Sequence, residues 1–131
     1  MSGKTLNAFL NPIKQPNVEY VASERFVGED GKPVPFELKV LSSGEGELAL
    51  RQAYVKGEID DISQRYEYAA KCVVYPDLTN AELLKAYGVL KASDLLREML
   101  TDSEFARLLQ KCYEVNGAIR NLQETVDEVK N

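Results

Sequence analysis

The residue types that most often carry out catalysis are scarce in this chain. It has no histidine among its 131 residues, so the commonest general base and metal ligand is missing. Its two cysteines, Cys72 and Cys112, do not form a CxxC pair, and without histidine a zinc site has almost nothing to coordinate with. Both lie in segments that we expect to be helical, and we interpret them as small buried hydrophobic residues, with a disulfide or a reactive thiol as the alternative.

The glycines and the acidic residues do not form a recognisable catalytic or phosphate-binding motif. Gly44-Glu45-Gly46 is the nearest approach to a phosphate-binding loop, but the remaining residues of such a motif are absent. Asp60-Asp61 and Asp127-Glu128 are pairs of sequence neighbours, and neighbours point in different directions on a helix. We interpret the first pair as charge at a helix N-terminus and the second as solvated surface. The sequence therefore predicts that the protein is not an enzyme and uses no cofactor or metal.

The charge distribution argues against nucleic acid and membranes as partners. Sixteen basic and 21 acidic residues give a net charge of -5, and the basic residues are scattered. A nucleic-acid-binding protein generally needs a basic face, and so does binding to an anionic membrane. No run approaches the roughly 20 apolar residues of a membrane span, and the N-terminal residues lack the apolar block of a signal peptide. We therefore expect a cytosolic protein without nucleic-acid or membrane partners.

The length and composition of the chain predict a single domain over residues 1–131, whose elements must position any functional surface. This length, with 44% hydrophobic and 28% charged residues, is typical of one globular domain with one core. Near the N-terminus, Leu6, Phe9 and Leu10 form a short apolar stripe that is stopped by Asn11-Pro12. Such a segment has at most two helical turns and is not stable alone, so it must dock on something.

A β-hairpin is predicted over about residues 18–41. The segment Val18–Val27 is rich in β-branched and aromatic residues, and after Pro35 apolar and charged residues alternate as far as Val40. Asp30-Gly31 lies between these two segments and is a strong hairpin signal. Because proline has no N–H to donate to a strand ladder, the second strand should begin after Pro35 or at a sheet edge.

The chain from about residue 43 to residue 117 has a helical pattern. Ser42–Glu45, Thr79–Glu82 and Thr101–Glu104 match capping boxes, in which a hydroxyl and a carboxylate satisfy the first N–H groups of a helix. Ser93 is expected to cap one more helix. The apolar residues that follow predict helices over about residues 43–57, 60–75, 79–88, 93–100 and from 102 onward.

The last segment has the most regular apolar spacing. Eight residues three and four apart form a heptad-like seam, namely Phe105, Leu108, Cys112, Val115, Ile119, Leu122, Val126 and Val129. Gly117 interrupts this seam, and glycine costs about 1 kcal/mol in a helix interior. Either one long helix continues through this weak point, or the chain breaks there and residues 118–131 form a separate C-terminal helical arm.

We expect that C-terminal arm to bind another protein through Ile119, Leu122, Val126 and Val129. Its opposite face is entirely polar, which suits a helix with only one apolar neighbour. The alternative, which the spacing leaves open, is that the seam packs on its own domain. The predicted fold is therefore mainly α with a small N-terminal β-hairpin (α+β). It comprises a compact helical domain of about five helices and a C-terminal helix that either protrudes or packs.

Nine short patches follow one another in a set order along the chain. They are Ser23–Phe26, Asp30–Glu37, Val73–Leu78, Ala81–Leu83, Tyr87–Val89, Leu95-Leu96, Met99-Leu100, Glu104-Phe105 and Glu114–Gly117. In this order they resemble the XkdN-like tail assembly chaperones of contractile-tailed bacteriophages and prophages. The likeness runs from about residue 5 to residue 117, and its specificity lies in the ordered set rather than in one patch.

The resemblance implies a function in the cytoplasm of a bacterial host. Chaperones of this family bind the tape-measure protein, a very long helical chain, and help tail-tube subunits to polymerise around it. They are absent from the finished virion, and many also occur in a longer form made by a ribosomal frameshift. The expected partner is therefore the tape-measure protein, with the tail-tube protein and self-association as further candidates. A structural tail-completion or baseplate-adjacent virion protein is the alternative.

Overall fold

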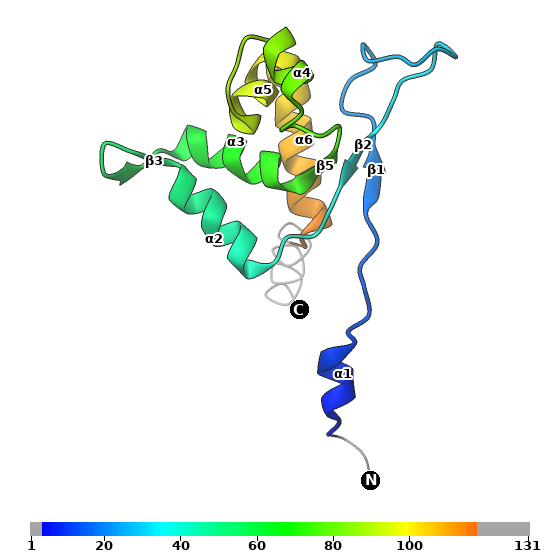
Figure 1. Cartoon of the computed structure of the whole chain (residues 1–131), viewed down its shortest axis with the longest axis vertical. Helices are drawn as coiled ribbons and strands as arrows, with labels where there is room; N and C mark the ends of the chain where they lie inside the picture. The colour runs from blue at the N-terminus through cyan, green and yellow to red at the C-terminus, as the bar shows by residue number, and fades with distance from the viewer. Residues whose placement is uncertain (1–3, 118–131) are drawn as a thin grey trace, which may run out of the picture.

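The computed structural model describes residues 4–117, which fold into helices and short antiparallel strands (Figure 1). In chain order the elements are α1 (Leu6–Leu10), β1 (Val18–Tyr20), β2 (Phe36–Leu38), α2 (Ser43–Gln52), β3 (Tyr54–Val55), β4 (Glu58–Ile59), α3 (Asp61–Cys72), β5 (Val73–Tyr75), α4 (Ala81–Ala86), α5 (Ala92–Met99) and α6 (Asp102–Val115). The mixed composition agrees with the predicted α+β class. Five helices, α2 to α6, follow the hairpin, as the sequence predicts.

The predicted hairpin is present as strands β1 and β2, which pair in antiparallel register with Tyr20 opposite Phe36 and Val18 opposite Leu38. Strand β2 begins directly after Pro35, as expected from the missing N–H of proline. Strand β1 is much shorter than predicted, because the chain leaves the ladder after Tyr20. It pairs again only at a bridge near the turn, where Gly31 has a φ of +78° that favours glycine.

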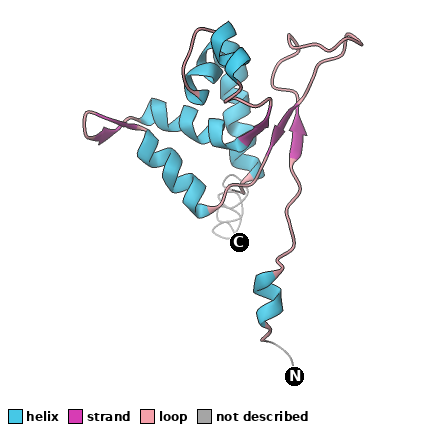
Figure 2. Cartoon of the chain, viewed as in Figure 1, coloured by secondary structure: helices cyan, strands magenta, loops and turns pink. Residues whose placement is uncertain are grey.

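A third strand, β5, completes the sheet in the order β1-β2-β5 (Figure 2). The apolar spacing predicted a helix that carried Val73 and continued to Tyr75, and this prediction was wrong. Helix α3 ends at Cys72, and Val73–Tyr75 pairs with β2 instead. The physical reason is that a Val-Val-Tyr run favours extended structure, and here it meets the open edge of β2.

The predicted helix over residues 43–57 is also too long. Helix α2 ends at Gln52, and Tyr54–Ile59 forms a two-stranded hairpin of β3 and β4. Its turn residues Lys56 and Gly57 both have positive φ angles, of 53° and 84°. Two positive φ angles are typical of the type I′ turn, whose twist matches that of the flanking strands. A Lys-Gly pair is a weaker signal for such a turn than Asn-Gly, so the helical pattern before it was extended too far.

Two of the three predicted capping boxes are confirmed. Ser42 with Glu45 and Thr101 with Glu104 each make both reciprocal hydrogen bonds. At α4 the cap is Asn80 rather than Thr79, because Thr79 lies within a turn in which both its N–H and its hydroxyl donate to Asp77, and the helix begins only after Asn80.

Helix α5 corrects the predicted Ser93 cap. The helix begins at Ala92, and Lys91 is its N-cap residue without a capping side chain. Ser93 is therefore buried inside the first turn and does not cap it. The helix starts earlier than the capping signal suggests because burial of its Leu95, Leu96 and Met99 face determines its position.

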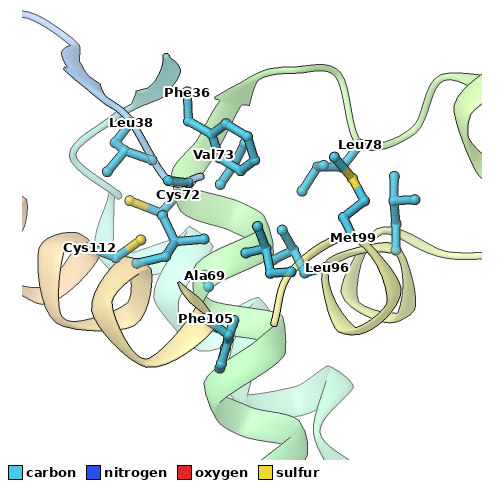
Figure 3. Close-up of a cluster of buried hydrophobic side chains, with 14 residues drawn as sticks. Phe36, Leu38, Ala69, Cys72, Val73, Leu78, Leu96, Met99, Phe105 and Cys112 are labelled. Carbon is cyan, nitrogen blue, oxygen red and sulfur yellow. The ribbon is translucent and has the colours of Figure 1, made fainter. Parts of the chain in front are cut away.

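The core lies between the sheet and helices α3, α5 and α6 (Figure 3). The largest fully buried side chains are Leu38, Leu95, Leu96, Leu108, Cys72 and Cys112. Figure 3 shows the two sulfur atoms between β2 and the α3 and α6 helices, turned toward each other. Both cysteines are buried thiols, which confirms the interpretation as small core residues. The first three residues of the predicted seam, Phe105, Leu108 and Cys112, are buried as well.

The seam breaks at the predicted weak point. Helix α6 ends at Val115, Asn116 is its C-cap, and Gly117 follows with a φ of +81°. This is the usual left-handed termination by glycine, so the alternative of one uninterrupted helix is wrong. The predicted C-terminal arm over residues 118–131 lies outside the described residues.

Candidate protein-binding site

The first candidate site is the segment from residue 4 to residue 17, which we call the N-terminal arm. Its helix α1 has only five residues, because Asn11-Pro12 stops it. None of these five residues is buried. Leu6, Phe9, Leu10 and Ile13 are 72%, 82%, 66% and 96% exposed. Figure 1 shows α1 projecting away from the sheet and helices on an extended connection. We expected this short helix to dock, but it packs on no other part of residues 4–117.

The second candidate site is an apolar groove of ≈ 190 Å³. It is lined by Phe26, Val34, Pro35, Phe36, Tyr75, Pro76, Leu83, Tyr87 and Met99. The walls come from the β1–β2 connection, β2, β5, α4 and α5, so the groove exists only in the folded chain. Tyr75 and Tyr87 are 53% and 37% exposed, and their rings combine an apolar body with a polar tip. Ligand pockets are usually about 300–1,000 Å³, so this groove suits one or two large apolar side chains.

All nine residues that line the groove belong to the patches on which the family resemblance rests. Phe26 comes from the first patch, Val34–Phe36 from the second, and Tyr75-Pro76 from the third. Leu83, Tyr87 and Met99 come from three later patches. Patches that are far apart in the sequence thus meet around one concave apolar surface.

A partly buried ion pair fixes the wall of the groove that contains Phe26. Two nitrogens of the Arg25 guanidinium donate to the two carboxylate oxygens of Glu104, at 2.6 and 3.3 Å, and Nη2 also donates to the Met99 carbonyl. The Arg25 hydrogen bonds lower the pKa of Glu104 to about 2, helped by donors from Ser23 and Thr101. The neighbouring Phe26 ring stacks on Phe36 at 6.4 Å. This network attaches the β1–β2 connection to the α5–α6 junction.

A larger cleft of ≈ 720 Å³ lies between α2, α3 and the start of α5, and its chemistry is different. Six of its fifteen lining residues are charged, and two of its lysines are already paired, Lys39 with Glu45 and Lys91 with Glu67. Charges that are already paired gain less free energy from binding a partner than an uncovered apolar surface does. We therefore regard the apolar groove and the N-terminal arm as the better candidates for protein binding.

The two core thiols shift each other's pKa in opposite directions. The neighbouring Cys72 thiol and burial raise the pKa of Cys112, whereas the Cys112 thiol and a hydrogen bond from Asn116 lower the pKa of Cys72 against the effect of its burial. Both side chains are fully buried in the core. Within residues 4–117, no three His, Cys, Asp or Glu side chains are grouped so that they could hold a metal ion. No helix of this part of the chain is long and apolar enough to cross a membrane.

The four predicted partner-binding residues, Ile119, Leu122, Val126 and Val129, lie outside the described residues. Sequence reasoning missed the groove, because its nine residues come from five separate elements and share no local period. It did detect the apolar stripe of α1 and expected that stripe to dock on something, without indicating what. The available signal was the spacing of Leu6, Phe9 and Leu10 together with the proline that keeps the helix short.

Comparison with known proteins agrees with the resemblance noted in the sequence. Residues 6–130 match the family model described as phage XkdN-like tail assembly chaperone protein. This match begins at the first residue of α1 and continues past Gly117, where the patches end. The family model therefore covers the N-terminal helix as well as the residues after Gly117.

Two proteins of Bacillus subtilis strain 168 are similar along most of their length. The phage-like element PBSX protein XkdN is 29% identical, with 100% of this chain and 90% of XkdN covered. The uncharacterized protein YqbN is 30% identical, with 91% of this chain and 87% of YqbN covered. The crystal structure of YqbN superposes with a TM-score of 0.76 at 27% identity, covering 88% of this chain and 98% of that chain.

Proposed function

The chain belongs to the phage XkdN-like tail assembly chaperone family, and from this premise we propose that it binds the tape-measure protein through the apolar groove. It would thereby assist polymerisation of the tail tube in the cytoplasm of the bacterial host, without catalysing a reaction. The observation that carries the proposal is the open apolar groove, with two half-exposed tyrosines on its rim.

The chemistry of the expected client supports this proposal. A tape-measure protein is a very long helix with an apolar stripe, and an uncovered stripe of that length aggregates. A groove that accepts one or two large side chains matches the helix-in-groove mode, in which residues on one helix face act as anchors. Many copies along one client can each bind weakly and still cover it, because their contacts add up. Weak single contacts also allow tube subunits to displace the chaperone.

The same proposal includes one further surface and one further partner. Ile119, Leu122, Val126 and Val129 form one apolar face in the sequence, and we propose them as a second contact with the client. The tail-tube protein is a further candidate partner, since displacement of the chaperone brings the two proteins together.

A solubility experiment tests client binding at the groove. Excess chain is expected to keep a fragment of the tape-measure protein soluble, and Tyr87→Glu is expected to weaken this binding at least about tenfold, which corresponds to 1.4 kcal/mol. The reason is that a carboxylate on the groove rim must lose water when an apolar side chain enters. Pull-down and sedimentation of the fragment measure the effect.

The matched control is Tyr54→Glu, the same change at an exposed tyrosine on the β3–β4 hairpin away from the groove. This variant should protect the fragment as well as the natural chain does. A fragment that precipitates even with excess natural chain would contradict the proposal, and so would equal loss of binding in both variants.

Analysis of purified phage particles separates the proposal from the structural alternative. A chaperone acts transiently, so mass spectrometry of particles is expected to detect this chain far below the copy number of the baseplate and tail-completion proteins. A stoichiometric copy in every particle would instead support a tail-completion or baseplate-adjacent protein. Tail sheath and tube proteins in the same sample serve as the reference for copy number.

A further inference from the structure

We propose that the N-terminal arm of one copy docks in the apolar groove of a second copy, so that two chains exchange arms when no client is bound. The exchange would cover both candidate sites at once. It does not itself depend on the proposed function, although the client experiment below does.

The arm requires a partner for physical reasons. A helix of five residues is far below the length at which an isolated helix is stable in water. The hydrogen bonds that the structure gives to the arm stay within it, such as the amide of Asn11 donating to the side chain of Asn7 at 2.8 Å, until Asn17 donates to Glu37. The exposed apolar side chains therefore gain no burial from their own chain in residues 4–117. Covering them with a second copy would bury them.

The arm and the groove match in chemistry and in size. Leu6, Phe9 and Leu10 have the spacing i, i+3 and i+4, which is the anchor spacing of helix-in-groove recognition. The groove offers aromatic and aliphatic walls and ≈ 190 Å³. This volume suits Phe9 together with Leu10, since a short helix can insert two neighbouring large side chains.

The structure directs the arm away from its own groove. The arm joins β1 at Val18, which pairs with Leu38, whereas the groove lies at the other end of this ladder, beside Phe36. Figure 1 shows α1 directed away from α4 and α5. A chain of seven residues, 11–17, spans at most about 25 Å when fully extended. Docking on the own groove would need a sharp reversal of this connection, whereas docking on a neighbouring copy would use it as it stands.

Charge favours the same pairing. The first 17 residues contain two lysines and no acidic residue, whereas the rest of the chain contains 14 basic and 21 acidic residues. The segments that line most of the groove, 24–37 and 75–87, contain six acidic and three basic residues. The nine lining residues carry no charge themselves, so the net charge of -3 on these segments attracts a basic arm toward the groove at longer range. The arrangement is reciprocal, and reciprocal contacts between identical chains close into a dimer.

Sedimentation of the full chain tests the exchange. Two small contacts predict a weak dimer with a Kd of about 10–100 µM, because the buried area is far below that of a stable interface. Phe9→Asp with Leu10→Asp is expected to raise this Kd at least tenfold. Asn7→Asp with Ala8→Asp places the same charge on the same helix away from the apolar stripe, and it should raise the Kd at most threefold. A natural chain that stays monomeric at 500 µM would overturn the proposal, as would a dimer that resists the first pair of changes.

Cross-linking identifies the docking place. Both native cysteines are buried, so a cysteine introduced on the surface becomes the accessible thiol. A tagged Ala8→Cys chain mixed with an untagged Ala86→Cys chain is expected to give the mixed dimer with a bismaleimide reagent, since both positions are exposed and neighbour Phe9 and Tyr87 without removing them. The same mixture with Tyr54→Cys should give little product. Equal yields in the two mixtures, or none in the first, would overturn docking in the groove.

Client binding separates this proposal from the proposed function. If a second copy's arm competes for the groove, the Phe9→Asp and Leu10→Asp chain should bind a tape-measure fragment as tightly as the natural chain or a few-fold more tightly. Loss of fragment binding in this variant would mean that the arm itself contacts the client. That result would overturn arm exchange and leave the proposal of client binding intact. A natural chain that forms the dimer but binds no fragment would instead overturn client binding and leave arm exchange intact.

Discussion

Replacing Asn116 by alanine is expected to lower the free energy of unfolding by about 2–3 kcal/mol, because it leaves partly buried backbone groups without partners. The Asn116 carboxamide oxygen accepts a hydrogen bond from the Leu41 N–H at 2.7 Å. Its nitrogen donates to the Cys112 carbonyl at 2.9 Å and lies 3.5 Å from that of Lys39. One side chain thus joins the end of α6 to the connection between β2 and α2. Denaturation in urea measures the change.

Two further variants show whether these hydrogen bonds are responsible. Asn17→Ala removes a single exposed hydrogen bond to Glu37, so it should change the unfolding free energy by less than about 0.5 kcal/mol. Asn116→Asp keeps an acceptor for Leu41 but turns a carboxylate toward two carbonyl oxygens, which raises its pKa in the folded state. Its deficit should therefore shrink as pH falls from 7 toward about 4, the ordinary pKa of the unfolded carboxyl, and change little below that. If Asn116→Ala lowers the free energy of unfolding no more than Asn17→Ala does, the hydrogen bonds of the Asn116 side chain do not contribute to stability.

The features that the sequence predicted correctly are local ones. The Ser42 and Thr101 capping boxes depend on residues three apart, and the alternation after Pro35 depends on residues two apart. The end of α6 was predicted as a weak point because glycine is costly in a helix. Such signals act over one turn or one strand, so neighbouring residues are enough to specify them.

The errors occur where distant partners decide the structure. Val73–Tyr75 could have continued a helix, but it becomes a strand because it meets the unpaired edge of β2. In this pairing Val73 lies opposite Leu38, which is 35 residues earlier in the sequence. The Asn80 cap replaces the Thr79 cap because the turn from Asp77 to Asn80 holds Thr79 before the helix, where a competing set of hydrogen bonds to Asp77 fixes it. Neither competition is visible in a periodic pattern.

The candidate site follows the same rule. The groove brings together Phe26, Phe36, Tyr75 and Tyr87 from four parts of the chain, so no local spacing could predict it. The arm was predictable as an apolar stripe, since Leu6, Phe9 and Leu10 stand one helical turn apart. Whether that stripe is buried by its own chain depends on the extended connection after Pro12, which has no periodic signature.

Replacing Glu104 by glutamine is expected to lower the free energy of unfolding by about 1–2 kcal/mol at pH 7, since an ion pair with a half-exposed arginine is partly screened by water. The Glu104 side chain is 12% exposed and that of Arg25 is 53% exposed. Glutamine keeps an oxygen for the Thr101 N–H, so the change mainly removes the charge that Arg25 contacts. Glu47→Gln removes the carboxylate of an exposed pair with Arg51, and it should cost less than about 0.5 kcal/mol.

The pH dependence of this difference identifies the ion pair as its cause. The pKa of Glu104 is lowered from an ordinary value of 4.5 to about 2, so on acidification the unfolded chain takes up its proton before the folded chain does. The stability contributed by the carboxylate is therefore complete above pH 4.5 and is lost as pH falls toward 2. The gap between the natural chain and Glu104→Gln should close over that interval. A gap that stays constant from pH 7 to pH 3 would mean that shape, not charge, makes Glu104 important, and the wall of the groove would then not depend on Arg25.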